Sequence, residues 1–551
     1  MFGINKILFT IVILCTLHHL KSKYTLQIYG DIGQNTEFLA NEGTIINDSN
    51  LFLYDKATDE CKKLEGEWKG VENLNNILQT DTQNSNFICN SNEIVVLGDN
   101  NYIETGKVQY ITKDNPNYPA WINRIMCNFS LIRKALENVQ CPKDTFNPLQ
   151  YKDSFNRFSK LNLLLGNHSF DVDYVVESQE SLNIATYYGY PFTTDTPPKD
   201  IFLEQRNINS DEFINFPVMQ TRINDDTRVE FLDLNILNIY CYLFDNPQRT
   251  EEKYNNCFFK HSQYGIFPSF SNSETYTKRF ILAINSFTPI SNWRVIRLHH
   301  PIFNIAGFPG EQSFLWREKI DSNGNTLLDL IKLNNVNIIL AGHTHNSQIL
   351  SFPWSQLSHT KDVYSKLQPP ITIGLNGKVV DLNLVTCPDS GCINRPKCYF
   401  NNKLLGNNTE NTSCDEKSKM VFPHNNKTPS NLIVVVVGNG KIEDALENDQ
   451  KSSAALLWAR AITIGGSQLT FEKDKLKVQN FEGNSVFTFE TESTTDDYLP
   501  ILNDYVKFKL NGDNISKTEP NKILPFEYPH YSTINENEKE IRFIGFLQEM
   551  N

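Results

Sequence analysis

Two histidines one residue apart, His343 and His345, follow a short apolar run at 337–340. Such a run is typical of a buried strand, and Gly342 lets the backbone turn where the strand ends. Imidazoles at positions i and i+2 can then converge on a metal ion from the strand tip. Because histidine is also a common loop residue, the interpretation depends on complementary ligands at other strand ends.

Four other apolar runs end in residues of matching chemistry: 25–29 with Asp31, 93–97 with Asp99 and Tyr102, 161–165 with Asn167 and His168, and 293–298 with His299. Each residue alone also fits a turn or a packed core. Their agreement at every strand end favours a site, since oxygen ligands mixed with imidazole suit iron, manganese or zinc. Asp99 can bridge two such ions about 3.5 Å apart, the separation used for in-line attack on phosphorus.

Strands that alternate with helical segments predict an α/β sheet to position these residues. Helical spacing occupies 121–136 and 326–332, and another helix ends near 280–285, whereas 174–228 is predicted to be irregular. Further strands are expected at 229–234, 432–437, 461–464, 476–478 and 486–490, with turns at 465–466 and 482–484.

The composition limits the classes of partner and compartment. The net charge of 51 − 64 = −13 offers no basic surface to nucleic acid. Residues 1–22 are predicted to be a cleaved signal peptide, because the apolar stretch 7–17 after Lys6 is too short to span a bilayer. We therefore expect a secreted protein or one in a lysosome- or vacuole-like lumen, with no transmembrane anchor after leader removal.

Cysteines and glycosylation motifs agree with that compartment. Ten cysteines remain after Cys15 leaves with the leader, and disulfides are their expected state. A zinc knuckle at Cys387, Cys392 and Cys398 is the alternative, and an oxidising lumen disfavours it. Glycans are predicted at six asparagines, which are Asn47, Asn128, Asn407, Asn411, Asn426 and Asn514.

The chain is long enough for one large domain with insertions or for two to four ordinary domains. We predict one domain over 24–493, interrupted by a Cys-rich insertion at about 352–430. Residues 494–551 are predicted to be a polar, acidic C-terminal extension.

The motifs in this order resemble the calcineurin-like metallophosphoesterase superfamily and, within it, the purple (tartrate-resistant) acid phosphatases. The Gly98-Asp99-Asn100-x-Tyr102 block distinguishes this subgroup, and the blocks at 300–306 and 342–346 continue the match. The resemblance covers 24 to about 350 and, more loosely, 431–493. It implies a four-layer α/β/β/α sandwich of two mixed sheets.

The resemblance also implies a binuclear centre and an acid phosphatase activity. Fe³⁺ would be held by Asp31, Asp99, Tyr102 and His345, and a divalent Fe²⁺, Zn²⁺ or Mn²⁺ by Asp99, Asn167, His299 and His343. A metal-bound hydroxide would attack the phosphate monoester. His168 would contact the phosphate and help to protonate the leaving oxygen. Asn167 also fits a glycosylation motif, but the metal role argues against a glycan there.

Two departures from the family pattern keep a second function open. Phe308 stands where the small purple phosphatases carry a second catalytic histidine, and Ser169 replaces the usual acid after Asn-His, with Asp171 nearby as a substitute. The alternative is a weakly active or inactive scaffold protein, similar to the apicomplexan motor-complex anchor built on the same fold. In that case this chain would bind a protein partner through its own insertion. Tyr102 disfavours a phosphodiesterase or nucleotidase.

Overall fold

The structure is a computed structural model, and it describes residues 23–33, 35–36, 52–55, 58, 60–63, 72–82, 87–103, 112–154, 156–185, 218–224, 227–243, 250–261, 265–287, 291–302, 319–321, 323–353, 398–400, 403–405, 419–421, 431–438, 440, 456–460, 464–473, 475–482 and 485–492. The predicted leader, Phe308, the extension at 494–551 and most of the insertion lie outside these ranges. So do five of the six predicted glycosylation sites. The domain boundaries remain predictions.

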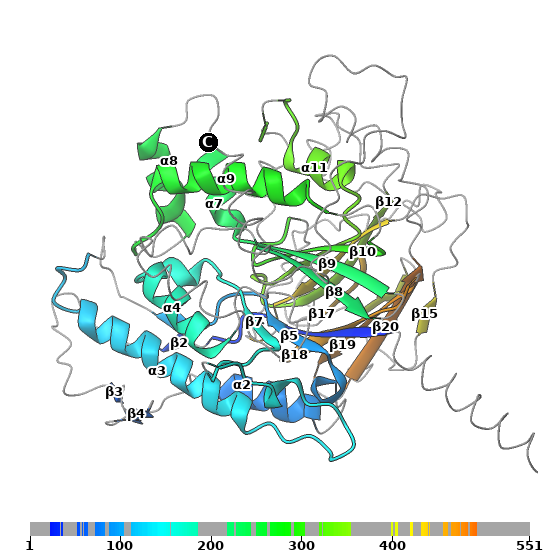
Figure 1. Cartoon of the computed structure of the whole chain (residues 1–551), viewed down its shortest axis with the longest axis horizontal. Coiled ribbons are helices and arrows are strands. Elements are labelled where there is room, and N and C mark those ends of the chain that lie inside the picture. Colours follow the sequence, from blue (N-terminus) through cyan, green and yellow to red (C-terminus); the bar gives the residue numbers. More distant parts are fainter. Residues whose placement is uncertain are drawn as a thin grey trace, which may run out of the picture.

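Two seven-stranded sheets form the centre of the protein (Figure 1). The first has the strand order β15 (Lys419–Val421), β20 (Ser485–Glu492), β19 (Lys475–Glu482), β18 (Gly465–Phe471), β1 (Tyr24–Tyr29), β5 (Glu93–Val96) and β7 (Leu161–Leu163). The second has the order β17 (Leu456–Arg460), β12 (Ser347–Pro353), β16 (Asn431–Val437), β11 (Ile338–Ala341), β10 (Trp293–Leu298), β9 (Thr227–Leu234) and β8 (Val218–Asn224). Both sheets mix parallel and antiparallel pairs.

Helices pack on the outer faces of the two sheets (Figure 1). Those against the first sheet are α2 (Glu72–Thr80), α3 (Tyr118–Glu137) and α4 (Tyr174–Ile184). Those against the second are α7 (Ile236–Leu243), α8 (Glu251–His261), α9 (Phe270–Ile284) and α11 (Leu327–Leu333). A third apolar core lies between the sheets and includes Ile28, Val95, Val295 and Leu340. The predicted α/β architecture of two mixed sheets is confirmed.

Shorter elements complete the described structure. They are β2 (Asn35–Thr36), β3 (Phe52–Asp55), β4 (Glu60–Lys63), β6 (Tyr102–Ile103), β13 (Cys398–Phe400), β14 (Lys403–Leu405), η3 (Ile88–Asn90), η4 (Pro148–Gln150) and η5 (His168–Phe170). Strand β15 comes from the predicted insertion and pairs in parallel with β20. The insertion therefore contributes an edge strand to the first sheet.

Two local predictions were wrong. The strand expected at 461–464 lies outside the described residues except for Ile464, which precedes β18, and β17 ends at Arg460. The expected Gly-Gly turn is instead the start of β18, and glycine marks a close approach there, since a Cβ at Gly466 would lie 2.8 Å from the Tyr29 ring on the neighbouring strand. The stretch 174–228 also contains α4 and β8. Polar residues such as Ser181 on the buried face of α4 obscured its helical period.

Three disulfides confirm the predicted state of six cysteines: Cys61–Cys127, Cys89–Cys141 and Cys241–Cys257. The glycan predicted at Asn128 is wrong for this fold, since the side chain is buried in α3 and its amide donates to the carbonyl oxygen of Asn100 (2.7 Å). None of the helices within the described ranges combines the length and the apolar character that crossing a membrane requires.

Candidate metal centre

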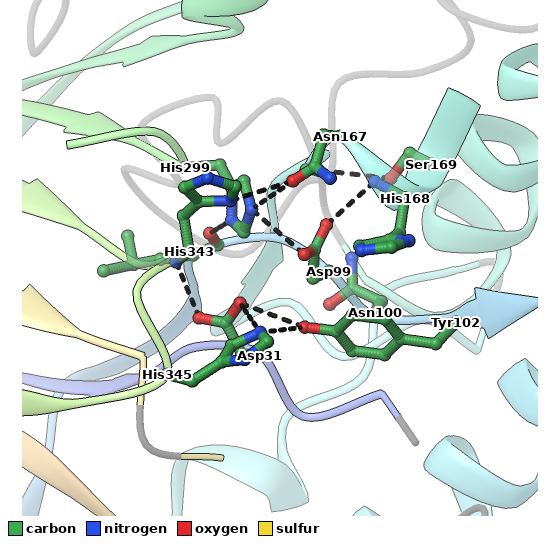
Figure 2. Close-up of polar contacts among 12 residues, drawn as sticks. Asp31, Asp99, Asn100, Tyr102, Asn167, His168, Ser169, His299, His343 and His345 are labelled. Carbon is green, nitrogen blue, oxygen red and sulfur yellow. Dashed lines mark hydrogen bonds and ion pairs between the residues drawn. The ribbon is translucent and has the colours of Figure 1, made fainter. Parts of the chain in front are cut away.

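The polar residues that follow five strands meet at one edge of the sheets (Figure 2). Strands β1, β5 and β7 are parallel in the first sheet, and β10 and β11 are parallel in the second. Parallel strands bring their carboxyl ends to the same edge, where ligands of open α/β sheets bind. The structure thus brings together all eight predicted site residues: Asp31, Asp99, Tyr102, Asn167, His168, His299, His343 and His345.

One cluster of ligand atoms surrounds the Asp31 carboxylate. The Tyr102 hydroxyl donates to Asp31 Oδ1 (3.1 Å) and lies 3.0 Å from His345 Nε2. His345 Nε2 is also 3.5 Å from Asp31 Oδ1. The backbone N–H of His343 donates to the other oxygen, Oδ2 (2.8 Å), and so orients the carboxylate. A carboxylate, a phenol and an imidazole therefore converge here.

A second cluster surrounds the amide oxygen of Asn167. This Oδ1 lies 3.1 Å from His299 Nε2 and 3.0 Å from His343 Nδ1. His299 Nε2 is in turn 3.1 Å from Asp99 Oδ2. Asp99 belongs to both clusters, because it forms one set of ligand atoms with His299 and His343 and a second set with Asp31 and His345, each set within 4.8 Å. The arrangement offers two adjacent cation sites that share one carboxylate.

The hydrogen bonds of His299 test whether cations fit this site. Its Nδ1 lies 2.7 Å from the carbonyl oxygen of Leu97, so Nδ1 carries the proton. In the neutral ring Nε2 then points a lone pair at acceptor oxygens of Asn167 and Asp99. Burial by itself would lower the pKa of His299, but the charge of Asp99 outweighs it and raises this pKa, so in the ion-free protein a proton on Nε2 can meet the buried Asp99 Oδ2. Lone pairs that face one another in the interior require a proton or a cation, and these residue types fit a cation.

The backbone of the site is strained. Six non-glycine residues in the described part of the chain have positive φ, and four of them are site residues: Asp31 (56°), Asp99 (50°), His343 (73°) and His345 (51°). The other two are Asn156 and Asn335. Strain of this kind costs of order 1–3 kcal/mol per residue and clusters at functional sites. The loops are therefore held by their surroundings in the conformations that bring the ligand atoms together.

His168 lies beside the two clusters. Its backbone N–H donates to Asp99 Oδ1 (3.1 Å), and its ring centroid is 4.3 Å from that of Tyr102. The ring Nδ1 lies 2.6 Å from Asp171 Oδ2. Asp171 is buried, whereas the His168 side chain is 23% exposed. Asp171 is therefore the buried partner of the His168 ring.

Burial and neighbouring charges set the protonation of the cluster in the ion-free protein. Burial by itself would raise the pKa of Asp99, but the charge on His299 outweighs it and holds this pKa well below its usual range. Burial, with the charge of His299, lowers the pKa of His343 well below its usual value. Burial, with Asp31 and Asp99, raises the pKa of Tyr102. Asp99 is thus ionised and His343 neutral, as metal binding requires, whereas Tyr102 keeps its proton until a cation displaces it.

Sequence reasoning missed Glu177. The Ser169 hydroxyl donates to its carboxylate (2.7 Å), and Ser169 Oγ accepts from the Gly166 N–H (3.1 Å). Burial is the largest cause that raises the pKa of Glu177, to about 8. The available signal was its position one turn from Tyr174 and Ser181, on the buried face of α4.

Gly98 permits the approach of the two sheets at the site. Its φ of +93° lies in the region that favours glycine. A Cβ at this position would lie 2.6 Å from His299 Nδ1. A larger residue would therefore push His299 away from Leu97 and from the ligand cluster.

No protein-family model matches the chain, and no curated protein matches it either. Solved structures with a partial likeness include a purple acid phosphatase from yellow lupin (13% identity, TM-score 0.37, 87% of this chain and 55% of that one). Others are GAP50, the anchor in the inner membrane complex of Plasmodium (10%, 0.38, 88% and 95%), and a dimetal phosphatase from Danio rerio (9%, 0.32, 84% and 98%). The chain spans about half the length of the lupin enzyme. At these values the likenesses establish neither a family nor an activity.

Proposed function

We propose that this protein is an acid phosphatase of the metallophosphoesterase superfamily, similar to the purple acid phosphatases, that hydrolyses phosphate monoesters. The observation that carries the proposal is the carboxylate of Asp99, which belongs to two adjacent sets of ligand atoms. Two cations held side by side can stabilise both the attacking and the leaving oxygen of an in-line displacement at phosphorus. A single metal site or an unrelated cluster of histidines would not require a shared carboxylate.

The residues sort into two ligand sets. We assign Asp31, Asp99, Tyr102 and His345 to an Fe³⁺ site, and Asp99, Asn167, His299 and His343 to a divalent Fe²⁺, Zn²⁺ or Mn²⁺ site. When bound, the two ions supply Lewis acidity and an activated water. The resemblance to the purple acid phosphatases assigns the trivalent ion to the site beside Tyr102, where the phenolate would supply an anionic oxygen ligand.

His168 is assigned to the leaving group. Asp171 holds its Nδ1 at 2.6 Å, which fixes the ring and directs proton exchange with the ester to Nε2. Its partial exposure places it at the boundary between the buried ligands and solvent. A general acid here would protonate the departing alkoxide.

Hydrolysis of para-nitrophenyl phosphate at mildly acidic pH tests the function. Full-length protein loaded with Fe³⁺ and Zn²⁺ should release nitrophenol, and the same protein stripped of metal by a chelator should not. No release from protein that has bound both ions would rule out the phosphatase assignment.

Colour tests the Tyr102 assignment separately. A tyrosinate bound to Fe³⁺ gives a visible charge-transfer band, so the loaded protein should be pink to purple and the Tyr102→Phe variant should lose the band. Wild-type protein that contains Fe³⁺ at this site but is colourless would contradict the role of Tyr102.

A binding or scaffold protein is the second candidate. It is favoured by Phe308, which cannot transfer a proton where the related phosphatases carry a second histidine. Loss of one general acid costs about 10²–10⁴-fold in rate. A rise in rate in the Phe308→His variant would support a weakened enzyme, whereas full metal loading without hydrolysis in either protein would support the scaffold.

We also propose that the protein resides in the secretory pathway or outside the cell. Three disulfides among the described residues support a place in the secretory pathway or outside the cell, because such bonds persist in oxidising surroundings. We keep the leader at 1–22 and a protein partner at the insertion as proposals.

A further inference from the structure

Glu93 makes four polar contacts in the protein interior. Its Oε2 accepts from the Tyr24 hydroxyl (2.6 Å) and from Nε of Arg222 (2.7 Å). Its Oε1 accepts from Nη1 of Arg297 (3.1 Å) and from the Asn162 side-chain amide. We call these five residues the Glu93 cluster.

Four members of this cluster come from strands that lead into the candidate metal centre, and Arg222 comes from β8. Glu93, Tyr24 and Asn162 belong to the first sheet, and Arg297 belongs to the second. The strands and the site residues that follow them are β1 with Asp31, β5 with Asp99, β7 with Asn167 and β10 with His299. One carboxylate therefore joins four of the five strands that supply ligand atoms.

The cluster is buried and charged. Glu93 and Arg297 are 1% and 0% exposed, and Arg297 also donates to Asp233 through Nε (2.5 Å) and Nη2 (2.8 Å). Burial by itself would raise the pKa of Glu93, but the charges of Arg222 and Arg297 outweigh it and lower the pKa to about 2. Desolvation cancels most of the stability gained from such pairs, and apolar replacements are often as stable. Stability alone therefore does not account for this cluster.

We propose that Glu93 is a positioning residue for the metal centre. It fixes β1, β5, β7 and β10 relative to one another and so sets the spacing of ligand atoms that come from different sheets. Asp99 Oδ2 and His299 Nε2 come from opposite sheets and are 3.1 Å apart. Metal–ligand distances hold within about 0.2 Å, so a small slip between the sheets would weaken binding. The inference rests on the proposed function in one respect, that the centre binds metal.

Two substitutions each remove one link and leave the Glu93 charge in place. Tyr24→Phe cuts the link to β1, and Asn162→Ala cuts the link to β7. In calorimetric titrations of ion-free full-length protein with Zn²⁺, Tyr24→Phe should weaken the Asp31 site about tenfold, and Asn162→Ala should weaken the Asn167 site by a similar factor. The reference variants His345→Ala and His299→Ala identify which binding step belongs to which site.

Tyr29→Phe is the matched control. Tyr29 is buried in the same strand, closer to Asp31, and its hydroxyl donates to the carboxylate of Asp81 (2.9 Å), outside the Glu93 cluster. The chemical deletion is the same, but both Zn²⁺ affinities should stay as in the wild type. Equal losses in Tyr29→Phe and Tyr24→Phe would overturn the proposal.

A charge-balanced double variant separates geometry from charge. Glu93→Gln with Arg222→Gln removes one negative and one positive charge, so the net charge of the protein is retained. Both Zn²⁺ steps should still weaken about 10- to 100-fold. Glu230→Gln, which breaks the buried pair with Arg228 (3.1 Å) on β9, should leave them unchanged.

The outcomes separate the two proposals. Wild-type protein that binds two Zn²⁺ ions, with unchanged affinities in Tyr24→Phe, Asn162→Ala and the double variant, would overturn the positioning role alone. Wild-type protein that binds no Zn²⁺ would overturn the metal centre and the positioning role together. If the double variant does not fold, the two single-link variants decide.

Discussion

The Glu93 cluster and the candidate metal centre are two buried polar clusters on largely the same strands, and their negative charges are compensated by different groups. In the Glu93 cluster each carboxylate oxygen accepts hydrogen bonds, and arginines balance the charge. In the candidate metal centre no lysine or arginine of the described residues forms an ion pair with Asp31 or Asp99. Buried charge is costly unless it is compensated. The comparison indicates that arginines compensate the Glu93 cluster permanently, whereas the carboxylates of the candidate metal centre face histidines, which can give up their protons to a bound cation.

Asp99→Ala should have the largest effect. Because Asp99 belongs to both ligand sets, its loss should remove both metal ions and all hydrolysis. Metal analysis of the dialysed variant by atomic emission checks this. A variant that retains two ions per chain would show that Asp99 does not bridge them, and the contrast with the Glu93 cluster would fail.

His168→Ala should come next, with a fall in kcat of about 10²–10⁴-fold and unchanged metal content. Asp171→Asn should cause a smaller fall, because the ring remains but its orientation is no longer held by a carboxylate. Steady-state kinetics with para-nitrophenyl phosphate measure both. Phenyl phosphate, with a poorer leaving group, should show the greater loss in His168→Ala, and equal losses with both esters would argue against a general acid.

Arg297→Met should lower the free energy of unfolding by about 3–5 kcal/mol, because Glu93 and Asp233 would lose a buried partner. Urea unfolding of the ion-free protein measures it. Asp99→Asn, under the same conditions, should not destabilise the protein to this extent, since it removes a carboxylate that forms no ion pair with a lysine or arginine of the described residues. Similar losses in the two variants would remove the distinction between the clusters.

The pH dependence of stability gives the smallest expected effect. The pKa of Glu93 is about 2 in the folded protein, below its ordinary value near 4.5. The stability linked to this depressed pKa is present above about pH 4.5 and is lost as the pH falls to about 2. The loss should be of order 3 kcal/mol. Urea midpoints between pH 2 and 5 should slope less in Glu93→Gln than in the wild type, and parallel slopes would contradict the assignment.

The sequence by itself determined the strands and the polar residues at their ends. Apolar runs such as 93–97 and 293–298 need no long-range information to be identified, because strand period and burial are local properties of the chain. The residue classes at Asp31, Asp99, His299 and His345 likewise predict metal ligands by their own chemistry. The structure places these side chains together, and their role as metal ligands stays a prediction.

Only the tertiary structure decided which side chains meet across the sheets. The pairs Glu93–Arg297 and Glu93–Tyr24 join residues 204 and 69 positions apart, and their contact depends on how strands and sheets are aligned. The burial of Asn128 and Glu177 depends in the same way on which helix face meets the first sheet. Local pattern does not encode such alignment, because it is fixed by the packing of the whole core between the two sheets.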